Sequence, residues 1–536
     1  MRIRGVSWWL TITALLAMVI VSAGARGQAA GEPPLVAAAR DGDVATVRAL
    51  LAQRADANAA ARDGSTALLW AAQRSNLDMA RALIAAGAKV DTPNRFGVTP
   101  LLQASRTGDA PLIDLLLKAR ASVSLSHPDG ETPLIAASRS GRLDAVKLLL
   151  EAGAAVNAAD TLQDQTALMW AAAEGHADVV SALLKAGADP NRGARVTALK
   201  KREHADHPTG GVTALMFAVR NGHSDIVRTL LQGGADVKAT NGDGATATII
   251  AIVNDRLDLA KELLDRGADA NDGSLYFAVD MHDATSDMRA RDGSRLRANH
   301  ENTVTALDLI TLLLDRGADP NKVFIGQLHS ASLCCGDDVN ASPFYRAAIA
   351  SDVEVIKRML AHGAQVEWVP SEVKKEGDAG SGGGGAAGRG ANANVGKTPL
   401  MMALVGGRGA AFGGGPGFNR TGPPPFREAA DREPLNAVKT LLAAGANPNA
   451  KAPDGSTPLH QAVAARQVPI IRALVAGGAK LDAVNKDDLT PLQLAEKPPT
   501  GPGNATQMDQ DAYQPPRNTR EEVIAALREL TGAGKP

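Results

Sequence analysis

Cysteine is nearly absent from this sequence. Its 536 residues contain only Cys334 and Cys335, which are neighbours in the chain. A disulfide-rich scaffold and a four-cysteine zinc site are therefore both excluded. With His329 and Asp337 nearby, the pair allows three interpretations: two unreacted thiols, a strained disulfide, or metal ligands. We predict no metal, because adjacent cysteines point in different directions and chelate one ion poorly.

Aromatic residues and net charge are also scarce. Aromatics make up 3% of the chain, whereas hydrophobic residues make up 45% and include much alanine and leucine. This composition favours thin layers of small residues over one large aromatic-rich core. The 57 basic and 58 acidic residues nearly cancel, which gives a formal charge of -1. Such a balance argues against a nucleic-acid-binding protein and against an acidic tail.

Catalytic motifs are missing as well. No Ser/His/Asp or Cys/His set with supporting motifs appears, and no paired carboxylates stand out. Ala391, Gly396, Lys397 and Thr398 match a relaxed phosphate-binding loop, but a glycine-rich tract precedes them instead of an apolar strand. We interpret Lys397 and Thr398 as a turn followed by a helix cap. We predict no enzyme activity, no bound nucleotide and no cofactor.

The N-terminus has the pattern of a signal peptide. Arg2 and Arg4 precede an apolar run at 8–21, and residues 23–25 are Ala-Gly-Ala. We predict a cleaved signal peptide over 1–25 and a periplasmic or secreted protein. An uncleaved membrane anchor is the alternative, although the run is shorter than the roughly 20 apolar residues of a membrane span. No later segment reaches that length, so we expect no stable membrane span after cleavage.

Two independent markers repeat along the chain with a period near 33 residues, which is the signature of a repeat protein. The first marker is a threonine, found at Thr66, Thr99, Thr132, Thr166, Thr213, Thr246, Thr457 and Thr490. The second is a Gly-Ala pair, beginning at Gly87, Gly153, Gly187, Gly234, Gly267, Gly317, Gly363, Gly445 and Gly478.

Residues 128–160 show how one unit begins. Asp129-Gly130 is a turn signal. Thr132 is placed as a helix N-cap and Pro133 as the first helical residue, where a missing N–H costs nothing. Gly141 then stops this first helix. The residues that keep helical spacing within it are Leu134, Ala137 and Ser138.

The same unit predicts a second helix that begins near Asp144. Val146, Leu149 and Leu150 lie at i, i+3 and i+4 and form one apolar face. Gly153 ends this helix as a left-handed cap. Each unit is therefore a turn and two short antiparallel helices. Neither helix can bury its apolar face alone, so the units must stack.

The units closely resemble the ankyrin repeat over residues 33–497, with interruptions. The family's Thr-Pro-Leu-His motif stands here as Thr457-Pro458-Leu459-His460, and elsewhere the histidine is lost almost everywhere. In the family this histidine hydrogen-bonds neighbouring turns. The resemblance implies an all-α, curved solenoid of about twelve helix-turn-helix units with short hairpin turns and atypical terminal units. Weaker versions of the motif begin at Thr66, Thr99, Thr132, Thr166, Thr213, Thr398 and Thr490.

Insertions divide the array. Their glycine- and proline-rich parts cannot bury enough apolar surface to offset the entropy of ordering. His204 and His207 lie in the first insertion, which we interpret as a solvated loop. The predicted organisation is repeats over 33–369 with insertions at 192–210, 281–303 and 321–342, a Gly-rich loop at 370–394, repeats over 395–497 with an insertion at 406–432, a Pro-rich loop at 498–518, and a C-terminal helix at 519–536.

Trp70, Trp170 and Phe217 share one register, four residues after the marker threonine. A large apolar residue repeated at one register is most simply part of the core between helices. We therefore predict a packing role for these three and no ligand site.

A row of arginines is the candidate binding site. Five first helices end with one, namely Arg40, Arg74, Arg106, Arg139 and Arg220. In ankyrin-like units such residues face the concave groove. One interpretation is that they are solvated cations near helix C-termini. The other is a binding row, since charges on units stacked about 10 Å apart reinforce one another within a Debye length of similar size. The predicted partner is then an unidentified protein, possibly acidic.

These patterns together predict an exported, non-catalytic scaffold that binds other proteins through the concave face and turns of its repeats. Two alternatives stay open. One is an accessory subunit or enzyme with its chemistry in the insertion at 321–342, and the other is a secreted effector that acts on host proteins. The alanine- and arginine-rich, lysine-poor usage suggests a bacterial source. A repeat array does not name its partner, because fold and function are separable.

Overall fold

A computed structural model describes residues 31–196, 210–283, 302–323, 341–370, 395–404, 434–497 and 518–532. Over these ranges the chain is helical, and its β-type pairings are three isolated bridges. This confirms the predicted all-α repeat fold. The predicted signal peptide, the pairs Cys334/Cys335 and His204/His207, and most of each predicted insertion lie outside the described residues. No helix within the described ranges is both long enough and apolar enough to cross a bilayer.

The chain forms two compact units, which meet in the sequence between Leu162 and Gln163. We call them the N-terminal unit and the C-terminal unit. The helices of the N-terminal unit are α2 (Pro34–Asp41), α3 (Val44–Ala52), α4 (Ala67–Gln73), α5 (Leu77–Ala85), α6 (Pro100–Thr107), α7 (Ala110–Lys118), α8 (Pro133–Arg139) and α9 (Leu143–Glu151).

The C-terminal unit continues the same alternation. Its helices are α10 (Ala167–Glu174), α11 (Ala177–Lys185), α12 (Ala214–Asn221), α13 (Ser224–Gln232), α14 (Ala247–Val253), α15 (Leu257–Asp265), α16 (Ser274–Asp283), α17 (Ala306–Asp315), α18 (Pro343–Ala350), α19 (Val353–Ala361), α20 (Pro399–Ala403), α21 (Pro434–Ala443), α22 (Pro458–Ala464), α23 (Val468–Ala476), α24 (Pro491–Glu496) and α26 (Arg520–Thr531).

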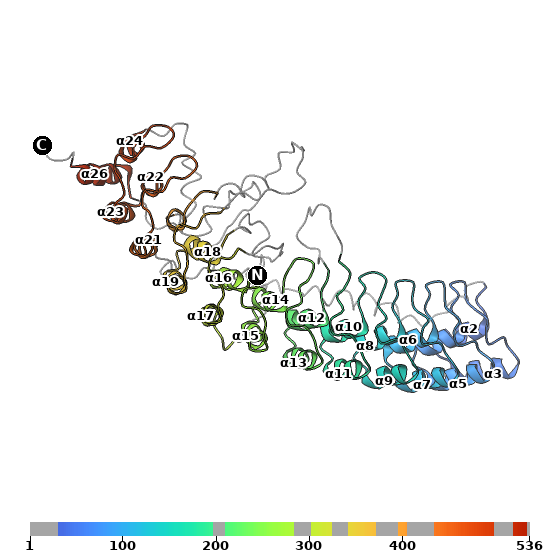
Figure 1. Ribbon diagram of the computed structural model, residues 1–536. Coiled ribbons are helices and arrows are strands. Elements are labelled where there is room, and N and C mark those ends of the chain that lie inside the picture. Colours follow the sequence, from blue (N-terminus) through green and yellow to red (C-terminus); the bar gives the residue numbers. More distant parts are fainter. Residues whose placement is uncertain are drawn as a thin grey trace, which may run out of the picture. The chain divides into compact units, whose positions relative to one another are not determined.

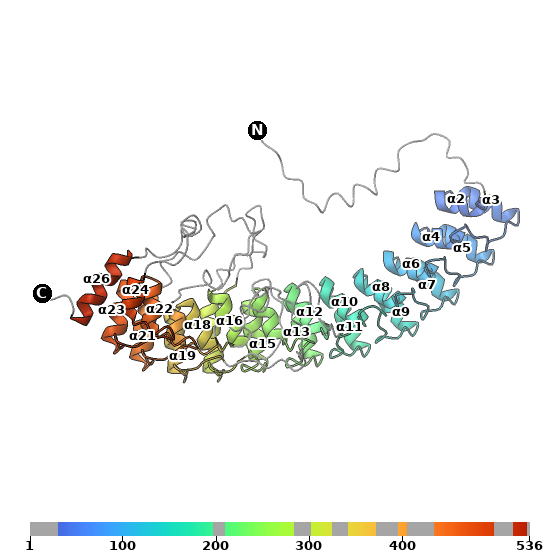
Figure 2. The same cartoon turned by 90° about the horizontal axis from the view of Figure 1, so that it is seen from above.

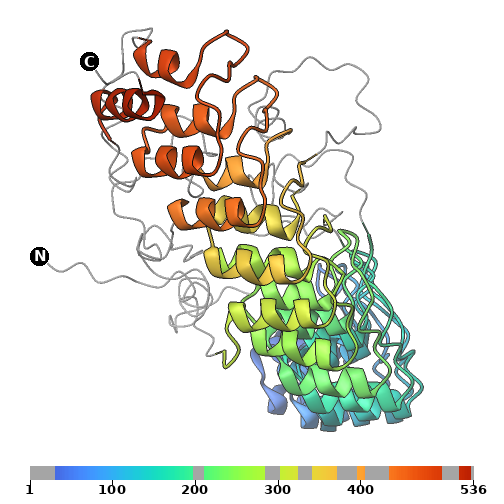
Figure 3. The ribbon, with the colours of Figure 1, turned by 60° about the vertical axis from the view of Figure 1, so that its left-hand side comes forward.

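The helices pair in chain order, and the described residues contain twelve such pairs. Within the N-terminal unit the first helices of the pairs (inner helices) pack side by side in one row, and the second helices (outer helices) pack in another (Figures 1 and 2). The C-terminal unit, viewed in Figure 3, stacks its pairs in the same way. The loop that joins an outer helix to the next inner helix is called a finger here. The fingers project on the side away from the outer helices (Figure 1).

The marker residues have the predicted local roles. The Thr132 side chain accepts a hydrogen bond from the Ile135 N–H, and Pro133 is the first helical residue. The same threonine cap begins the other inner helices at most marker positions, including Thr398 before α20. Gly153 has φ +84°, a left-handed conformation that suits glycine after a helix end. The interpretation of Lys397 and Thr398 as turn plus helix cap is therefore confirmed.

The core is a thin layer between the two rows of helices. Val146 and Leu149 of α9 are fully buried, as predicted, and Leu134 and Ala137 of α8 pack opposite them. Leu150 is only half-buried, because it turns toward the outer surface of its helix. Burial of the Leu134 and Leu149 side chains stabilises the folded state by about 1.5–3 kcal/mol each.

The prediction for the repeated aromatic residues holds for one of three. Phe217 is 8% exposed and belongs to the core. Trp70 and Trp170 are only half-buried, so the predicted core role is wrong for them.

Successive fingers are tied by an asparagine at a fixed register. Asn58 donates to the Gly87 carbonyl (3.2 Å) and accepts from the Lys89 N–H (2.7 Å), so one side chain joins two repeats. Asn449 makes the same two bonds to the repeat that follows it. Asn191, Asn271 and Asn321 repeat the pattern. These bonds satisfy backbone groups at the ends of the outer helices.

One histidine of the family motif is present and packs as the resemblance implies. His460 is 1% exposed, pairs through Nδ1 with the Thr457 hydroxyl (2.9 Å), and reaches the Leu489 carbonyl through Nε2 (2.9 Å). The side chain therefore links one finger to the next.

The repeat beginning at α16 departs from the pattern. Its helix starts at Ser274, seven residues after Gly267, so no finger hairpin precedes it. Asp272 fills that short connection and accepts a hydrogen bond from the Thr246 hydroxyl (2.5 Å). Farther along, Asp280 of α16 and Arg346 of α18 form an ion pair (2.9 Å) with both side chains 3% exposed. The hydrophobic period did not predict either feature.

Candidate functional site: arginines at the ends of the inner helices

The structure places four of the predicted arginines in the N-terminal unit. Arg40, Arg106 and Arg139 lie in the last turns of α2, α6 and α8. Arg74 lies one residue farther on, as the cap residue after α4. A cation near a helix C-terminus is favourable, because the free carbonyl groups there carry partial negative charge. The four residues therefore end consecutive inner helices, as predicted, and Arg74 differs in rotation about its helix.

Arg40 is paired within its own repeat. Its guanidinium lies 2.5 Å from the Glu32 carboxylate and 3.4 Å from that of Asp41. Two carboxylates therefore neutralise this position, and it adds no free positive charge to the row.

Arg106 and Arg139 share one carboxylate, that of Glu131. Arg106 approaches the Glu131 Oε2 atom at 2.5 Å, and Arg139 approaches Oε1 at 2.8 Å. The Glu131 side chain is 7% exposed, whereas those of Arg106 and Arg139 are 30% and 43% exposed. A buried carboxylate thus links two successive repeats.

Sequence reasoning missed Glu131. The residue stands directly before a marker threonine, where Ser65 and Val98 stand in the preceding repeats. A carboxylate at a position that is small or apolar in the two preceding repeats was the signal that would have located it.

Arg74 is the most available cation of the row. Its side chain is exposed and lies over Gly42 of the preceding repeat. Among the described residues none forms an ion pair with it. An added ligand can therefore reach its five N–H donors without displacing a carboxylate.

Arg220 belongs to the C-terminal unit and has a different environment. Its guanidinium lies 5.1 Å from the centre of the Phe217 ring, within the range of a cation–π contact. It is exposed, and it ends α12 in the register of Arg106 and Arg139.

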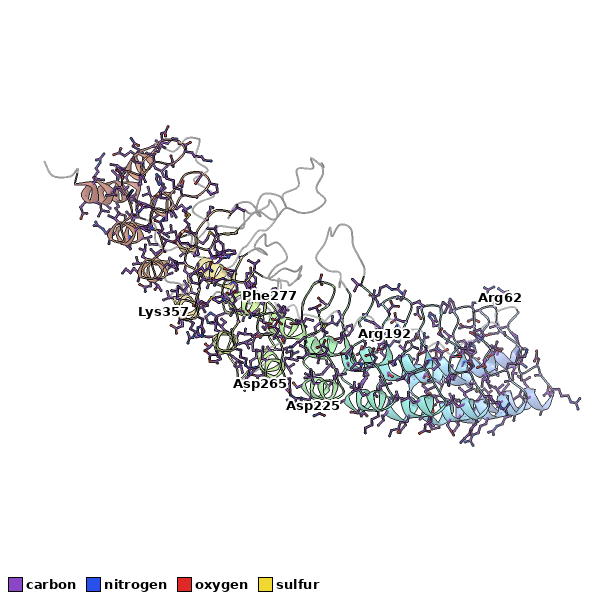
Figure 4. The ribbon with its side chains drawn as sticks, in the orientation of Figure 1. Arg62, Arg192, Asp225, Asp265, Phe277 and Lys357 are labelled. Atoms are coloured by element: carbon purple, nitrogen blue, oxygen red, sulfur yellow. The ribbon has the colours of Figure 1, made fainter. Side chains whose placement is uncertain are left out.

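Charged side chains also occupy the fingers and the outer helices. Figure 4 labels Arg62 at the fingers of the N-terminal unit, and Asp225 and Lys357 on the outer helices α13 and α19. Within the described ranges no three histidine, cysteine, aspartate or glutamate side chains gather as metal ligands would. What the arginine row can do chemically is hold carboxylates, and the role in binding remains a prediction.

Comparison with known proteins identifies a protein family that this chain matches. The model named "Ankyrin repeats (3 copies)" matches residues 12–94, 35–126, 101–194, 195–274 and 426–498. These ranges cover more than half of the chain. They leave out the part that contains the Asp280–Arg346 pair.

Among solved structures, the crystal structure of the human ASB11 ankyrin repeat domain is similar at 25% sequence identity, with a TM-score of 0.36. The match covers 44% of this chain and 98% of that one. No curated protein matches the sequence. The family-model matches and the stacked helix pairs agree, and the chain belongs to the ankyrin repeat family.

Proposed function

We propose that this chain is an exported, non-catalytic scaffold whose N-terminal unit binds an acidic segment of a partner protein. Ankyrin repeats bind protein partners, which supports the interaction role. The observation that carries the acidic preference is Arg74, an exposed guanidinium with which no described residue forms an ion pair. Arg106 and Arg139 lie around the shared Glu131 carboxylate in the following inner helices. Arg40 does not contribute, because its carboxylates already neutralise it.

The test uses the full chain without residues 1–25 and a poly-glutamate peptide as the probe. Arg74→Glu places a like charge against the peptide, so binding at low salt should weaken severalfold and its salt dependence should fall. Arg81→Glu is the matched control, since Arg81 is exposed on the outer helix α5 and the net charge change is the same. Equal weakening by the two substitutions would mean that peptide binding depends only on the net charge of the protein.

Arg106 and Arg139 need a gentler change than charge reversal. A glutamate at either position would face the buried Glu131 carboxylate, and repulsion there would disturb folding. The combined variant Arg74→Glu with Arg139→Gln avoids this, and circular dichroism checks that it stays folded. Poly-glutamate affinity equal to that of the parent at all salt concentrations would contradict the proposal.

Export is proposed from the sequence alone. The charged start, the apolar run and the Ala-Gly-Ala segment favour cleavage after residue 25 or residue 30. Cleavage after residue 25 removes Arg2 and Arg4 and changes the formal charge from -1 to -3. Mass spectrometry of the expressed full-length chain should find the new N-terminus outside the cytoplasm. Intact Met1 in the membrane fraction would support the anchor instead.

A further inference from the structure

A cavity of about 340 Å³ opens between two neighbouring fingers of the N-terminal unit. One finger contributes Asp91 and Pro93, and the next contributes Leu125 and Pro128. The arginine row plays no part in it, since none of those arginines lines this cavity. Its walls combine apolar groups with the Asp91 carboxylate, the His127 ring and the hydroxyl residues Thr99, Ser126 and Thr161.

Asp91 occupies the register where Asn58, Asn191, Asn271, Asn321 and Asn449 link successive fingers in other repeats. Asn58 uses both its amide oxygen and its amide nitrogen to join two repeats. Asp91 keeps only the first of these bonds, accepting from the Ser122 N–H at 2.9 Å. A carboxylate has no N–H to make the second bond. Where Asn58 is neutral and forms two hydrogen bonds to the next repeat, Asp91 is negatively charged and forms one. Its second carboxylate oxygen is not used in this link.

That charge is not neutralised by the protein. In the part of the chain that the structure describes, no lysine or arginine lies within ion-pair distance of Asp91. The carboxylate is half-buried and lines the cavity. A cationic ligand would thus gain from an electrostatic contact that the fold leaves open.

The apolar walls exist because of local backbone chemistry. Elsewhere in this unit neighbouring fingers share a backbone hydrogen bond, such as that from the Arg95 N–H to the Asp63 carbonyl (2.7 Å). Pro128 has no N–H and cannot make that bond to the preceding finger. Its ring packs instead against Gly97, beside the exposed Phe96 and Leu125 side chains. The joint between these fingers is therefore apolar and open.

We propose that this cavity binds an arginine or lysine side chain of a partner protein. The aliphatic stem would lie along Pro93, Leu125 and Pro128, and the cationic head would pair with Asp91. The inference rests on the proposed function in one respect, that the ligand belongs to a protein. It adds that the partner carries a basic residue for the fingers as well as an acidic stretch for the arginine row.

Methyl NMR spectra of the full chain without residues 1–25 test the cavity directly. The probes are acetyl-Gly-Arg-Gly-amide and its citrulline counterpart, which has nearly the same shape and no charge. The Leu125 methyl signals should shift saturably with the arginine peptide. The citrulline peptide should bind about fivefold more weakly, the loss expected for a partly exposed ion pair.

Asp91→Asn is the informative variant, because it restores the residue type that the same register carries at Asn58 and the fold should be retained. It should remove the preference for arginine over citrulline. Asp114→Asn is the matched control, an exposed carboxylate on α7 that does not line the cavity, and it should keep the preference. Either an unshifted Leu125 signal or equal binding of the two peptides to the parent overturns the inference.

Poly-glutamate binding separates this result from the proposed function. Asp91→Asn should leave it nearly unchanged, because Asp91 is not part of the arginine row. If the protein binds poly-glutamate but the cavity does not bind the arginine peptide, the inference about the cavity is wrong and the proposed function stands. Loss of poly-glutamate binding in Arg81→Glu as much as in Arg74→Glu would reject the proposed function alone.

Discussion

Glu131 and Asp91 show how single residues give individual character to a repeated fold. Both stand at positions where neighbouring repeats carry uncharged residues, and both introduce a carboxylate. The Glu131 carboxylate forms ion pairs with Arg106 and Arg139, so its effect is structural as well as electrostatic. Asp91 has no cationic neighbour at ion-pair distance in the described residues, so its charge is available to a ligand.

Replacing Glu131 by glutamine should have two opposite effects. Folding should be weakened by about 1–3 kcal/mol, because charge-assisted hydrogen bonds from arginine to a buried carboxylate are lost. Poly-glutamate should bind more tightly, because the row gains one net positive charge. Thermal unfolding followed by circular dichroism and a peptide titration measure the two effects. Glu151→Gln, at an exposed position that ends α9, should change neither.

Asp272 gives a pH-dependent prediction in the C-terminal unit. Burial raises the pKa of its carboxyl above the usual value, although hydrogen bonds with Ser274 and Thr246 oppose this. The folded state therefore favours the protonated form, and stability from this group increases as the pH falls through the raised pKa. It follows that the ionised group weakens the folded state at neutral pH.

Asp272→Asn should consequently raise the melting temperature at pH 7, since asparagine resembles the protonated carboxyl. The gain should shrink as the pH is lowered toward about 4, where the unfolded carboxyl also becomes protonated. Melting curves between pH 4 and 7 measure it. Asp225→Asn, at an exposed position on α13, provides the comparison. A stabilisation that is independent of pH would show that burial of the charge is not the cause.

At the scale of one element, α26 closes the array. The Thr519 side chain and Glu522 form a reciprocal cap at its N-terminus. Val523, Ala526 and Leu527 are buried where the helix packs on α23 and α24. On its outer side Glu529 pairs with Arg472 through two contacts of 2.7 and 3.2 Å. A terminal helix with one apolar and one charged face is what the end of a stack requires.

The two faces of α26 should respond differently to substitution. Leu527→Ala should cost about 2–5 kcal/mol of local stability, because a fully buried side chain leaves a cavity. Glu529→Gln should change the melting temperature little, because both partners of that pair are exposed to solvent. Hydrogen exchange of the α23–α26 amides measures both. A larger effect of Glu529→Gln would mean that the ion pair, and not the core, fixes the helix.

At the scale of the whole molecule, the parts fixed by the repeat were predictable from sequence. A threonine cap, a proline at the first helical position and a glycine after the second helix each specify backbone geometry locally, so the helix pairs follow from the period. The arginines were located for the same reason. Their charge balance was not, because Glu131 reaches Arg106 across a repeat boundary.

The missed features share this cause. The shortened connection before α16 changes the spacing between markers, and the Asp280–Arg346 pair joins residues 66 positions apart. A hydrophobic period carries no information about either. The cavity at Asp91 could have been suspected from the loss of asparagine at its register, but its walls depend on how two fingers pack.

The contacts between helices predict how far the loss of stability caused by one substitution should spread along the array. In each unit, helices pack against those of their own pair and of the adjacent pairs. Leu149→Ala removes a fully buried side chain from α9 and should cost about 2–5 kcal/mol locally. Because stability in such arrays is a sum of repeat and nearest-neighbour terms, exchange should accelerate most in α6–α9. The α22–α26 amides should retain the protection of the parent protein.

Hydrogen exchange read by mass spectrometry resolves these segments in one experiment. Leu148→Ala is the matched control, since the neighbouring side chain is only half-buried and loses less apolar contact. It should raise exchange in α8 and α9 by a smaller factor than Leu149→Ala does. Uniform acceleration from α2 to α26 in Leu149→Ala would instead require the whole chain to unfold as one cooperative body. The nearest-neighbour description would then have to be abandoned for this protein.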